Sequence, residues 1–230
     1  MKKTLSVTPN KKELRWGAVY LVLDMTALPI LISLIWQAFG VSLSVSQLNA
    51  IFFIVSFGIT TILFRDFIKK TLLDSLHHIP QILRGAFRGF LVYWGRNLLI
   101  SMLILHVNPD FMNVNDANIS VMVESDFLPI AICTIFFVPI TEELLFRGVL
   151  FAGCYRRSPV LAFLVSAVVF SAIHVVGYIS DYSWDILLLC FIQYIPASIA
   201  LGVAYAKSGS ILSPMLMHIV INAIGILAMR

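Results

Sequence analysis

The chain has 230 residues, of which 60% are hydrophobic and only 12% are charged, and its formal net charge is +4. A soluble domain has about 45–50% apolar and about 25% charged residues, so this composition argues against a soluble protein. Runs of 18 or more apolar residues recur along the chain, which predicts an all-α, polytopic membrane helix bundle. A basic charge can also indicate nucleic-acid binding, but no nucleic acid is expected here because the basic residues follow a membrane pattern.

Seven membrane-spanning helices are predicted. A span needs about 20 residues to cross a hydrocarbon core of about 30 Å. The first apolar run is too long for the core of a signal peptide, so we expect it to stay in the protein as a helix. The fourth run is the longest and is expected to tilt or to project into the cytoplasm. The predicted spans are residues 17–39, 48–64, 89–106, 127–155, 160–179, 186–206 and 211–229.

The charges outside these spans predict the orientation of the bundle. With the N-terminus in the cytoplasm, the basic loops fall on the inner side and the acidic loops on the outer side, as the positive-inside rule requires. Short loops then favour a multi-pass protein of a bacterial plasma membrane. The inner residues are Lys2, Lys3, Lys11, Lys12, Arg15, Arg65, Lys69, Lys70, Arg84, Arg88, Arg156, Arg157 and Lys207; the outer residues are Asp110, Asp116, Glu124, Asp126, Asp181 and Arg230.

The segment between the second and third spans, "RDFIKKTLLDSLHHIPQILRGAFRGF", mixes apolar and basic residues. We expect an amphipathic helix on the inner membrane surface, broken near Pro80, with basic side chains close to anionic lipid headgroups. A solvated basic loop is the alternative. With three helices and an acidic outer loop, this segment makes up residues 1–126. Residues 127–230 form the predicted helical core of the same integral domain.

Charged side chains inside the spans are costly to bury and are therefore functional candidates. Glu143 and Arg147 are four residues apart on the fourth span, so they share a helix face and can pair. Glu142 points about 100° away from Glu143 and is left to serve a cavity. Two carboxylates in different environments are a usual way to separate a structural role from an acid–base role.

Two later spans add histidines. His174 lies four residues after Phe170 on the fifth span, and His218 lies four residues before Asn222 on the seventh. Taken alone, a transmembrane histidine is more often a hydrogen-bonded packing residue, and an asparagine more often links helices. Their joint occurrence with Glu142 on three of the last four spans favours a site.

A second polar pair is predicted away from this site. Asp24 on the first span and Arg96 on the third are each about seven residues from the inner ends of their helices. At matching depth they could neutralise each other. We interpret them as a structural ion pair rather than as part of the site.

The predicted site has the parts for hydrolysis of an amide. A carboxylate in an apolar cavity can act as a general base, a nearby histidine can hold the same water, and a second histidine with an asparagine can stabilise an oxyanion. The H-E-x-x-H motif of ordinary zinc peptidases is absent. Glu142, His174 and His218 could nevertheless bind a divalent metal such as zinc, so metal-free and metal-assisted water activation both remain open.

Three short motifs carry a family resemblance. "EELLFR" (142–147), "FSAIH" (170–174) and "HIVIN" (218–222) resemble the EExxxR, FxxxH and HxxxN motifs of the CAAX protease and bacteriocin-processing family of intramembrane endopeptidases, also called CPBP or Abi. The resemblance covers about residues 127–228. It implies Glu142 as the base, His174 as a ligand of water or metal, His218 and Asn222 as oxyanion stabilisers, Glu143 and Arg147 as a supporting pair, and Phe170 as a packing residue.

The resemblance leaves the substrate open. It implies a peptide bond near the membrane, in a prenylated C-terminus, a leader peptide or a membrane protein, and a bacterial origin argues against the first. One alternative is a non-catalytic scaffold or bacteriocin-immunity protein that acts by binding a partner. Another is a transporter with Glu142 and His174 as a proton relay, although no inverted repeat is found. The sequence predicts no oligomeric state.

Overall fold

The computed structural model describes residues 5–230, so Lys2 and Lys3 lie outside the described part of the chain. The described residues contain helices and no strand, which confirms the predicted all-α bundle. In chain order the helical elements are α1 (Lys11–Met25), α2 (Ala27–Ala38), α3 (Val45–Leu63), α4 (Arg65–Ser75), α5 (Ile79–Val107), α6 (Val114–Ser125), α7 (Phe127–Ile132), η1 (Cys133–Phe137), α8 (Val138–Glu142), η2 (Glu143–Phe151), α9 (Ala152–Tyr155), α10 (Pro159–Val176), α11 (Trp184–Ser208) and α12 (Leu212–Ala228).

Membrane-spanning helices are present, in somewhat smaller number than predicted. Among the described residues, five helices are long and apolar enough to cross a membrane, or six if the bent pair α1 and α2 is one span. The helix α12 is apolar but has only 17 residues, which is the lower limit of length for a transmembrane helix. The chain is therefore a multi-pass helical membrane protein. Its cytoplasmic N-terminus and its division after residue 126 stay predictions.

The first predicted span is not one straight helix. The helices α1 and α2 meet at Thr26 with a bend of 53°. Pro29 lies in the first turn of α2. A proline ring clashes with the carbonyl four residues before it, here that of Met25, and this clash accounts for the bend at Thr26.

The predicted break near Pro80 is confirmed, but the helix that follows is longer than expected. The helix α4 ends at Ser75, and α5 begins at Ile79 with Pro80 in its first turn, where proline is tolerated. Residues 79–88 therefore belong to the third span, whose helix has 29 residues. The glycines Gly85 and Gly89 let this part of α5 approach α11 and α12 closely.

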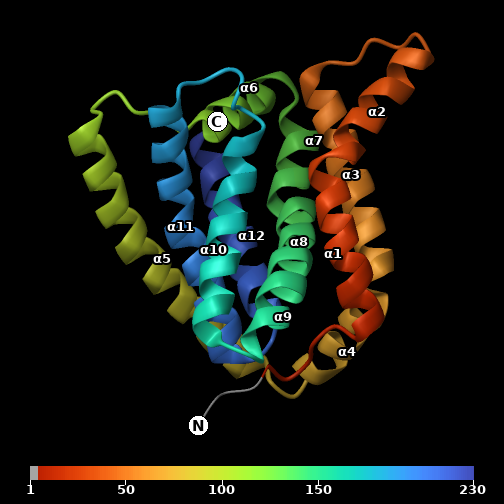
Figure 1. The fold of residues 1–230 in the computed structure, drawn as a ribbon, viewed down its shortest axis with the longest axis vertical. Helices are drawn as coiled ribbons and strands as arrows, with labels where there is room; N and C mark the ends of the chain where they lie inside the picture. Colours follow the sequence, from red (N-terminus) through yellow and green to blue (C-terminus); the bar gives the residue numbers. More distant parts are fainter. Residues whose placement is uncertain (1–4) are drawn as a thin grey trace.

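The acidic outer loop contains a helix that was not predicted. Asn113 caps α6 by accepting hydrogen bonds from the backbone N–H groups of Asn115 and Asp116, at 3.0 and 3.3 Å. In Figure 1, α6 lies at the same end of the bundle as the C-terminus, and the opposite end holds the start of α1, α4 and α9. The bundle thus has an acidic α6 end and a basic α4 end.

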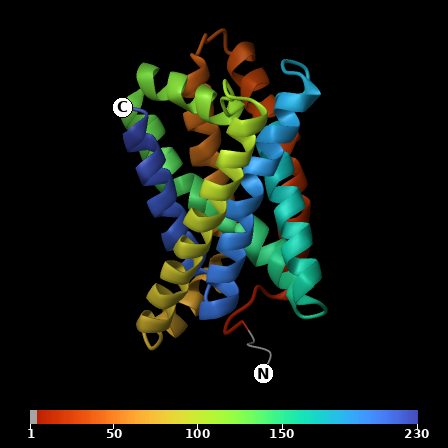
Figure 2. The ribbon, with the colours of Figure 1, turned by 90° about the vertical axis from the view of Figure 1, so that its left-hand side faces the viewer.

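The fourth span, from Phe127 to Tyr155, forms the centre of the bundle. It packs against α1 and α3 on one side and against α10, α11 and α12 on the other. The long helix α5 packs mainly against α11 and α12, beside which it runs in Figure 2. Helices from both halves of the sequence therefore meet around the fourth span, which carries the predicted carboxylates.

Candidate active site

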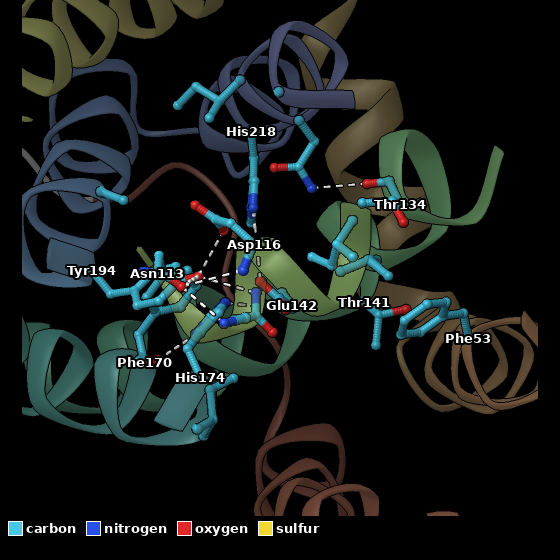
Figure 3. A pocket seen from close by; sticks show the side chains of 18 of the residues that line it. Phe53, Asn113, Asp116, Thr134, Thr141, Glu142, Phe170, His174, Tyr194 and His218 are labelled. Carbon is cyan, nitrogen blue, oxygen red and sulfur yellow. Dashed lines mark hydrogen bonds and ion pairs between the residues drawn. The ribbon is translucent and has the colours of Figure 1, made fainter. Parts of the chain in front are cut away.

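A cavity of about 740 Å³ lies inside the bundle, and five of the predicted site residues line it: Glu142, Phe170, His174, His218 and Asn222. They come from α8, α10 and α12. Figure 3 shows Glu142, His174 and His218 converging from these separate helices. The structure thus brings together side chains that are up to 80 positions apart in the sequence, from Glu142 to Asn222.

The fourth span changes its helical winding at the two carboxylates. The α-helix α8 ends at Glu142, and the π-helix η2 begins at Glu143. π-helical segments are rare and often occur at functional sites. The change leaves Glu142 facing the cavity while Glu143 is fully buried in the protein. The two carboxylates therefore lie in different environments, and their separate roles stay a prediction.

The predicted ion pair between Glu143 and Arg147 forms. The Arg147 Nη1 atom lies 3.1 Å from Glu143 Oε1, and both side chains are completely buried. Arg147 Nη2 donates to the carbonyl and hydroxyl oxygens of Ser198 on α11, at 3.1 and 3.2 Å. The guanidinium also lies 4.7 Å from the centre of the Phe170 ring. These contacts tie the fourth span to α10 and α11.

His218 links the buried pair to the cavity. Its Nδ1 atom lies 2.9 Å from Glu143 Oε1, and its Nε2 atom lies 3.8 Å from Glu142 Oε2. An ionised carboxylate only accepts hydrogen bonds, so Nδ1 carries a hydrogen when Glu143 is ionised, and the neutral ring then presents the Nε2 lone pair to Glu142. This contact with Glu143 adds to the role that the sequence implied for His218.

His174 is held in the same way by a backbone group. Its Nδ1 atom lies 2.7 Å from the carbonyl oxygen of Phe170, and its Nε2 atom lies 4.0 Å from Glu142 Oε1. Because a carbonyl can only accept, Nδ1 carries the hydrogen and Nε2 faces the carboxylate. The Phe170 ring packs against His174 and against Phe146, with centroid distances of 4.6 and 5.4 Å. This agrees with the packing role predicted for Phe170.

Asn222 lines the cavity, and its side-chain amide nitrogen makes one hydrogen bond within the protein. Its Nδ2 atom donates to the carbonyl oxygen of Thr134 on η1, at 2.8 Å. An amide nitrogen has two hydrogens, so one remains for a ligand in the cavity. Asn222 can therefore join α12 to the fourth span and still act as a donor in the site.

A polar group near α6 was missed by the sequence interpretation. The Tyr194 ring is stacked on His174, with centroids 4.1 Å apart. Its hydroxyl donates to Asp116 Oδ1 at 3.1 Å and accepts from Asn115 Nδ2 at 3.0 Å. Burial raises the pKa of Asp116, which the hydrogen bond from Tyr194 partly offsets. In the sequence, Asn113 followed by Asp116 is a helix-start signal that could have located α6. No sequence signal distinguished Tyr194 from the other aromatic residues.

The predicted ion pair between Asp24 and Arg96 is wrong. Asp24 lines the cavity and accepts hydrogen bonds from Tyr20 at 3.0 Å and from Ser56 at 2.5 Å. Arg96 is exposed on α5, and no ion pair joins it to Asp24 in the described part of the chain. Equal depth did not imply contact, because α1 packs mainly against α2, α3 and η2, while α5 packs mainly against α11 and α12.

The predicted metal ligands Glu142, His174 and His218 face one another without forming a ready metal site. Among residues 5–230, no group of three or more His, Cys, Asp or Glu side chains is arranged to hold a metal ion. Their hydrogen bonds at Nδ1 are nonetheless of the kind that orients metal-binding histidines. Metal assistance stays a prediction, and the chemistry below depends only on the side chains of the chain.

The fold and the site together define a helical membrane bundle in which acidic and imidazole groups meet in an internal cavity. Residues 124–224 match the family model described as type II CAAX prenyl endopeptidase, Rce1-like. The match contains all three motifs and confirms the predicted resemblance to the CAAX protease family over this part of the chain. By its description this is a family of endopeptidases, and the matched residues make up less than half of the chain. No curated protein and no solved structure matches the chain.

Proposed function

We propose that the protein is an intramembrane endopeptidase that hydrolyses a peptide bond of a membrane-associated substrate, with Glu142 activating the attacking water. One observation carries the proposal: the Glu142 carboxylate lies between two imidazole Nε2 atoms, 4.0 Å from that of His174 and 3.8 Å from that of His218. All three side chains line one cavity. The match to the CAAX endopeptidase family supports the same reaction class.

The spacing suits water activation. Distances near 4 Å are too long for direct hydrogen bonds but allow one water to bridge the carboxylate and an imidazole. Glu142 Oε2 is buried and has no hydrogen-bond partner among the described residues, so it is available as a proton acceptor. As the water oxygen attacks the substrate carbonyl carbon, a C–O bond forms and the water proton moves to Glu142. When the C–N bond then breaks, Glu142 returns this proton to the leaving amine.

His218 and Asn222 are positioned to stabilise the oxyanion of the tetrahedral intermediate. Asn222 has one amide hydrogen left after its bond to Thr134. His218 can donate through Nε2 only as an imidazolium, because Nδ1 already donates to Glu143. Glu142 and Glu143 together would then balance the charges of His218 and Arg147. Through its contact with Nδ1, Glu143 would thus support a cationic His218, which is more than a packing role.

His174 serves as the positioning partner of the water. Its ring is fixed by the Phe170 carbonyl and by the stacked Tyr194 ring, so its Nε2 atom is directed at Glu142. A fixed ring avoids the reorganisation that would otherwise accompany the transition state. We therefore assign orientation of the water to His174 and proton transfer to Glu142.

The substrate is proposed at the level of class. Many of the residues that line the cavity are apolar or aromatic, among them Phe52, Phe53 and Ile221, which suits a peptide segment that is itself embedded in or anchored to a membrane. The name of the matching family refers to prenylated CAAX substrates. For this chain we propose a leader peptide or a membrane protein, in a bacterial plasma membrane.

The proposal is tested by incubating the purified protein with a panel of synthetic membrane peptides, with and without a chelator, and by locating any cut by mass spectrometry. Glu142→Gln should lower the cleavage rate by about 10²- to 10⁴-fold, the contribution typical of a general base, and should leave the protein folded. Glu124→Gln, at an exposed position on α6, is the matched control and should cleave normally. Inhibition by the chelator would establish metal assistance. If Glu142→Gln and His218→Ala cleave as fast as the unmodified protein, a scaffold role replaces the enzymatic one.

A further inference from the structure

We propose that the substrate reaches Glu142 from the non-cytoplasmic side of the membrane, so that the protein cleaves peptides presented at that face. This inference rests on the proposed peptidase function for its substrate but not for its geometry. Its basis is that the cavity reaches the acidic end of the bundle, whereas packed side chains close it toward the basic end.

The residues that line the cavity show this direction. The helix α1 contributes only its last turn, with Asp24 and Met25, and α3 contributes only the half that lies nearest its start, residues 48–53. The helix α10 contributes residues 170–176, and α12 contributes residues from His218 onward. Since α1 and α3 run in opposite directions, these parts lie at one end of the bundle. It is the end where α6 and the C-terminus lie in Figure 1.

The opposite direction is closed by packed side chains. Beyond Glu142, toward α9, the residues Leu144, Arg147 and Phe151 are completely buried. Tyr205 on α11 and Met217 on α12 belong to the same core and are also shielded from solvent. Protein interiors are close-packed, and a core of this kind admits no peptide. The basic end therefore offers no route to Glu142 through this core.

The rim of the cavity is accessible at the acidic end. Val176 and Gly177, at the end of α10, line the cavity and are exposed, as is Ile224 on α12. Asp116, on α6, also lines it. A peptide that enters here passes α6 and Tyr194 before it reaches His174 and Glu142.

The charges assign this end to the non-cytoplasmic side. Figure 1 places the start of α1, α4 and α9 together at the other end, so the basic residues of 11–15, 65–70 and 156–157 gather there. The positive-inside rule puts such an end in the cytoplasm. The acidic residues of 110–126 then lie outside, and one of them, Asp116, lines the cavity.

The charge of the cavity indicates which charge the substrate segment can carry. Its carboxylates are Asp24, Asp116 and Glu142, and the described residues that line it include no lysine or arginine. Such a cavity disfavours an acidic segment, because like charges repel in a poorly solvated space. The expected substrate is a neutral or basic peptide segment on the outer face of the membrane, such as an exported or outer-leaflet peptide, and not a cytosolic lipidated tail.

Thiol labelling tests the direction of access without any catalysis. In a background that carries Cys133→Ala, Cys154→Ser and Cys190→Ala, single cysteines are introduced by Glu142→Cys, Gly177→Cys and Gly153→Cys. Gly177 and Gly153 are a matched pair, because both are exposed and an added Cβ meets no described atom within 4 Å at either position. The probe is 2-(trimethylammonium)ethyl methanethiosulfonate, a cation that does not cross membranes and suits an acidic cavity. It is applied to intact cells and to inverted membrane vesicles.

We expect Glu142→Cys and Gly177→Cys to be labelled in intact cells, and Gly153→Cys only in inverted vesicles. Labelling of Glu142→Cys only in inverted vesicles would overturn the proposal, as would an absence of labelling from both sides. Reversed labelling of the glycine pair would show that the orientation is wrong. None of these outcomes depends on proteolysis, so a failed peptide assay with the expected labelling would contradict the proposed function alone.

Discussion

Charged side chains make different kinds of contact in the two halves of the bundle. In the half toward the basic end, Glu143 and Arg147 are fully buried and pair directly, and Arg147 also donates to Ser198. In the half toward α6, the described residues give Glu142 no direct hydrogen bond, and its carboxylate faces two imidazoles across distances of 3.8 and 4.0 Å. Direct contact satisfies a charge, whereas a spaced arrangement leaves groups available for a ligand. The comparison separates residues that hold the fold from residues that carry the chemistry.

The largest effect on stability is expected in the packed half. Arg147→Met leaves Glu143 buried without its main partner, and loss of one member of a buried ion pair costs about 3–5 kcal/mol. Thermal unfolding of the protein in detergent measures the change. Arg157→Met is the matched control, because Arg157 is exposed in the loop after α9, and its effect should lie within about 0.5 kcal/mol. If the two variants unfold at the same temperature, the buried pair does not have this role.

Close packing of α5 gives the next prediction. A Cβ added at Gly89 would lie 2.6 Å from Met217 Sδ and 2.9 Å from the carbonyl oxygen of Ala200. Gly89→Ala should therefore destabilise the protein by about 1–3 kcal/mol, the usual cost of overpacking. Gly95→Ala on the same helix meets no described atom within 4 Å and should be neutral or slightly stabilising. Equal unfolding temperatures for the two variants would contradict the close approach of α5 to α11 and α12.

In the open half, changes should affect rate more than stability. Tyr194→Leu removes the ring stacked on His174, and an aromatic pair contributes about 0.5–1.5 kcal/mol, which corresponds to about a 2- to 10-fold loss in kcat. Tyr194→Phe keeps the ring and should lose less, although it removes the hydrogen bonds to Asp116 and Asn115. Steady-state kinetics with a cleaved peptide separates kcat from KM. A purely structural Tyr194 would lower the unfolding temperature and leave kcat unchanged.

The smallest effect is expected at Arg96. This side chain is exposed, so Arg96→Gln should change the free energy of unfolding by less than about 0.5 kcal/mol. Asp24→Asn should cost more, because it weakens the hydrogen bonds from Tyr20 and Ser56. Exchanging the charges of Asp24 and Arg96 should give no rescue. If the variant with exchanged charges were more stable than either single variant, Asp24 and Arg96 would form an ion pair, contrary to the structure.

The parts of the site that follow from local helix geometry could be predicted from the sequence. The spacing of Glu143 and Arg147 placed them on one face, and the adjacent position of Glu142 turned it elsewhere, as the structure shows. The contact between His218 and Glu143 could not be predicted, because it depends on how α12 docks against the fourth span. Asp24 was assigned the wrong partner for the same reason, since depth along a helix does not specify its neighbours.

The fold divides in a similar way. Long apolar runs predicted the helices α3, α10 and α11 to within a few residues. The bend at Thr26 and the helix α6 escaped the interpretation because hydropathy does not register a single proline or a capped polar segment. Pro29 and Asn113 were the local signals for these two features.

The most direct test of the account is a double-mutant cycle on the cleavage rate, with Glu142→Gln, His174→Ala and the variant that carries both changes. If the two side chains act on one water, the double variant should be no slower than the slower single variant, because residues that act as a unit are strongly non-additive. If the two losses simply multiply, Glu142 and His174 act independently, and the shared site at the centre of this account is wrong.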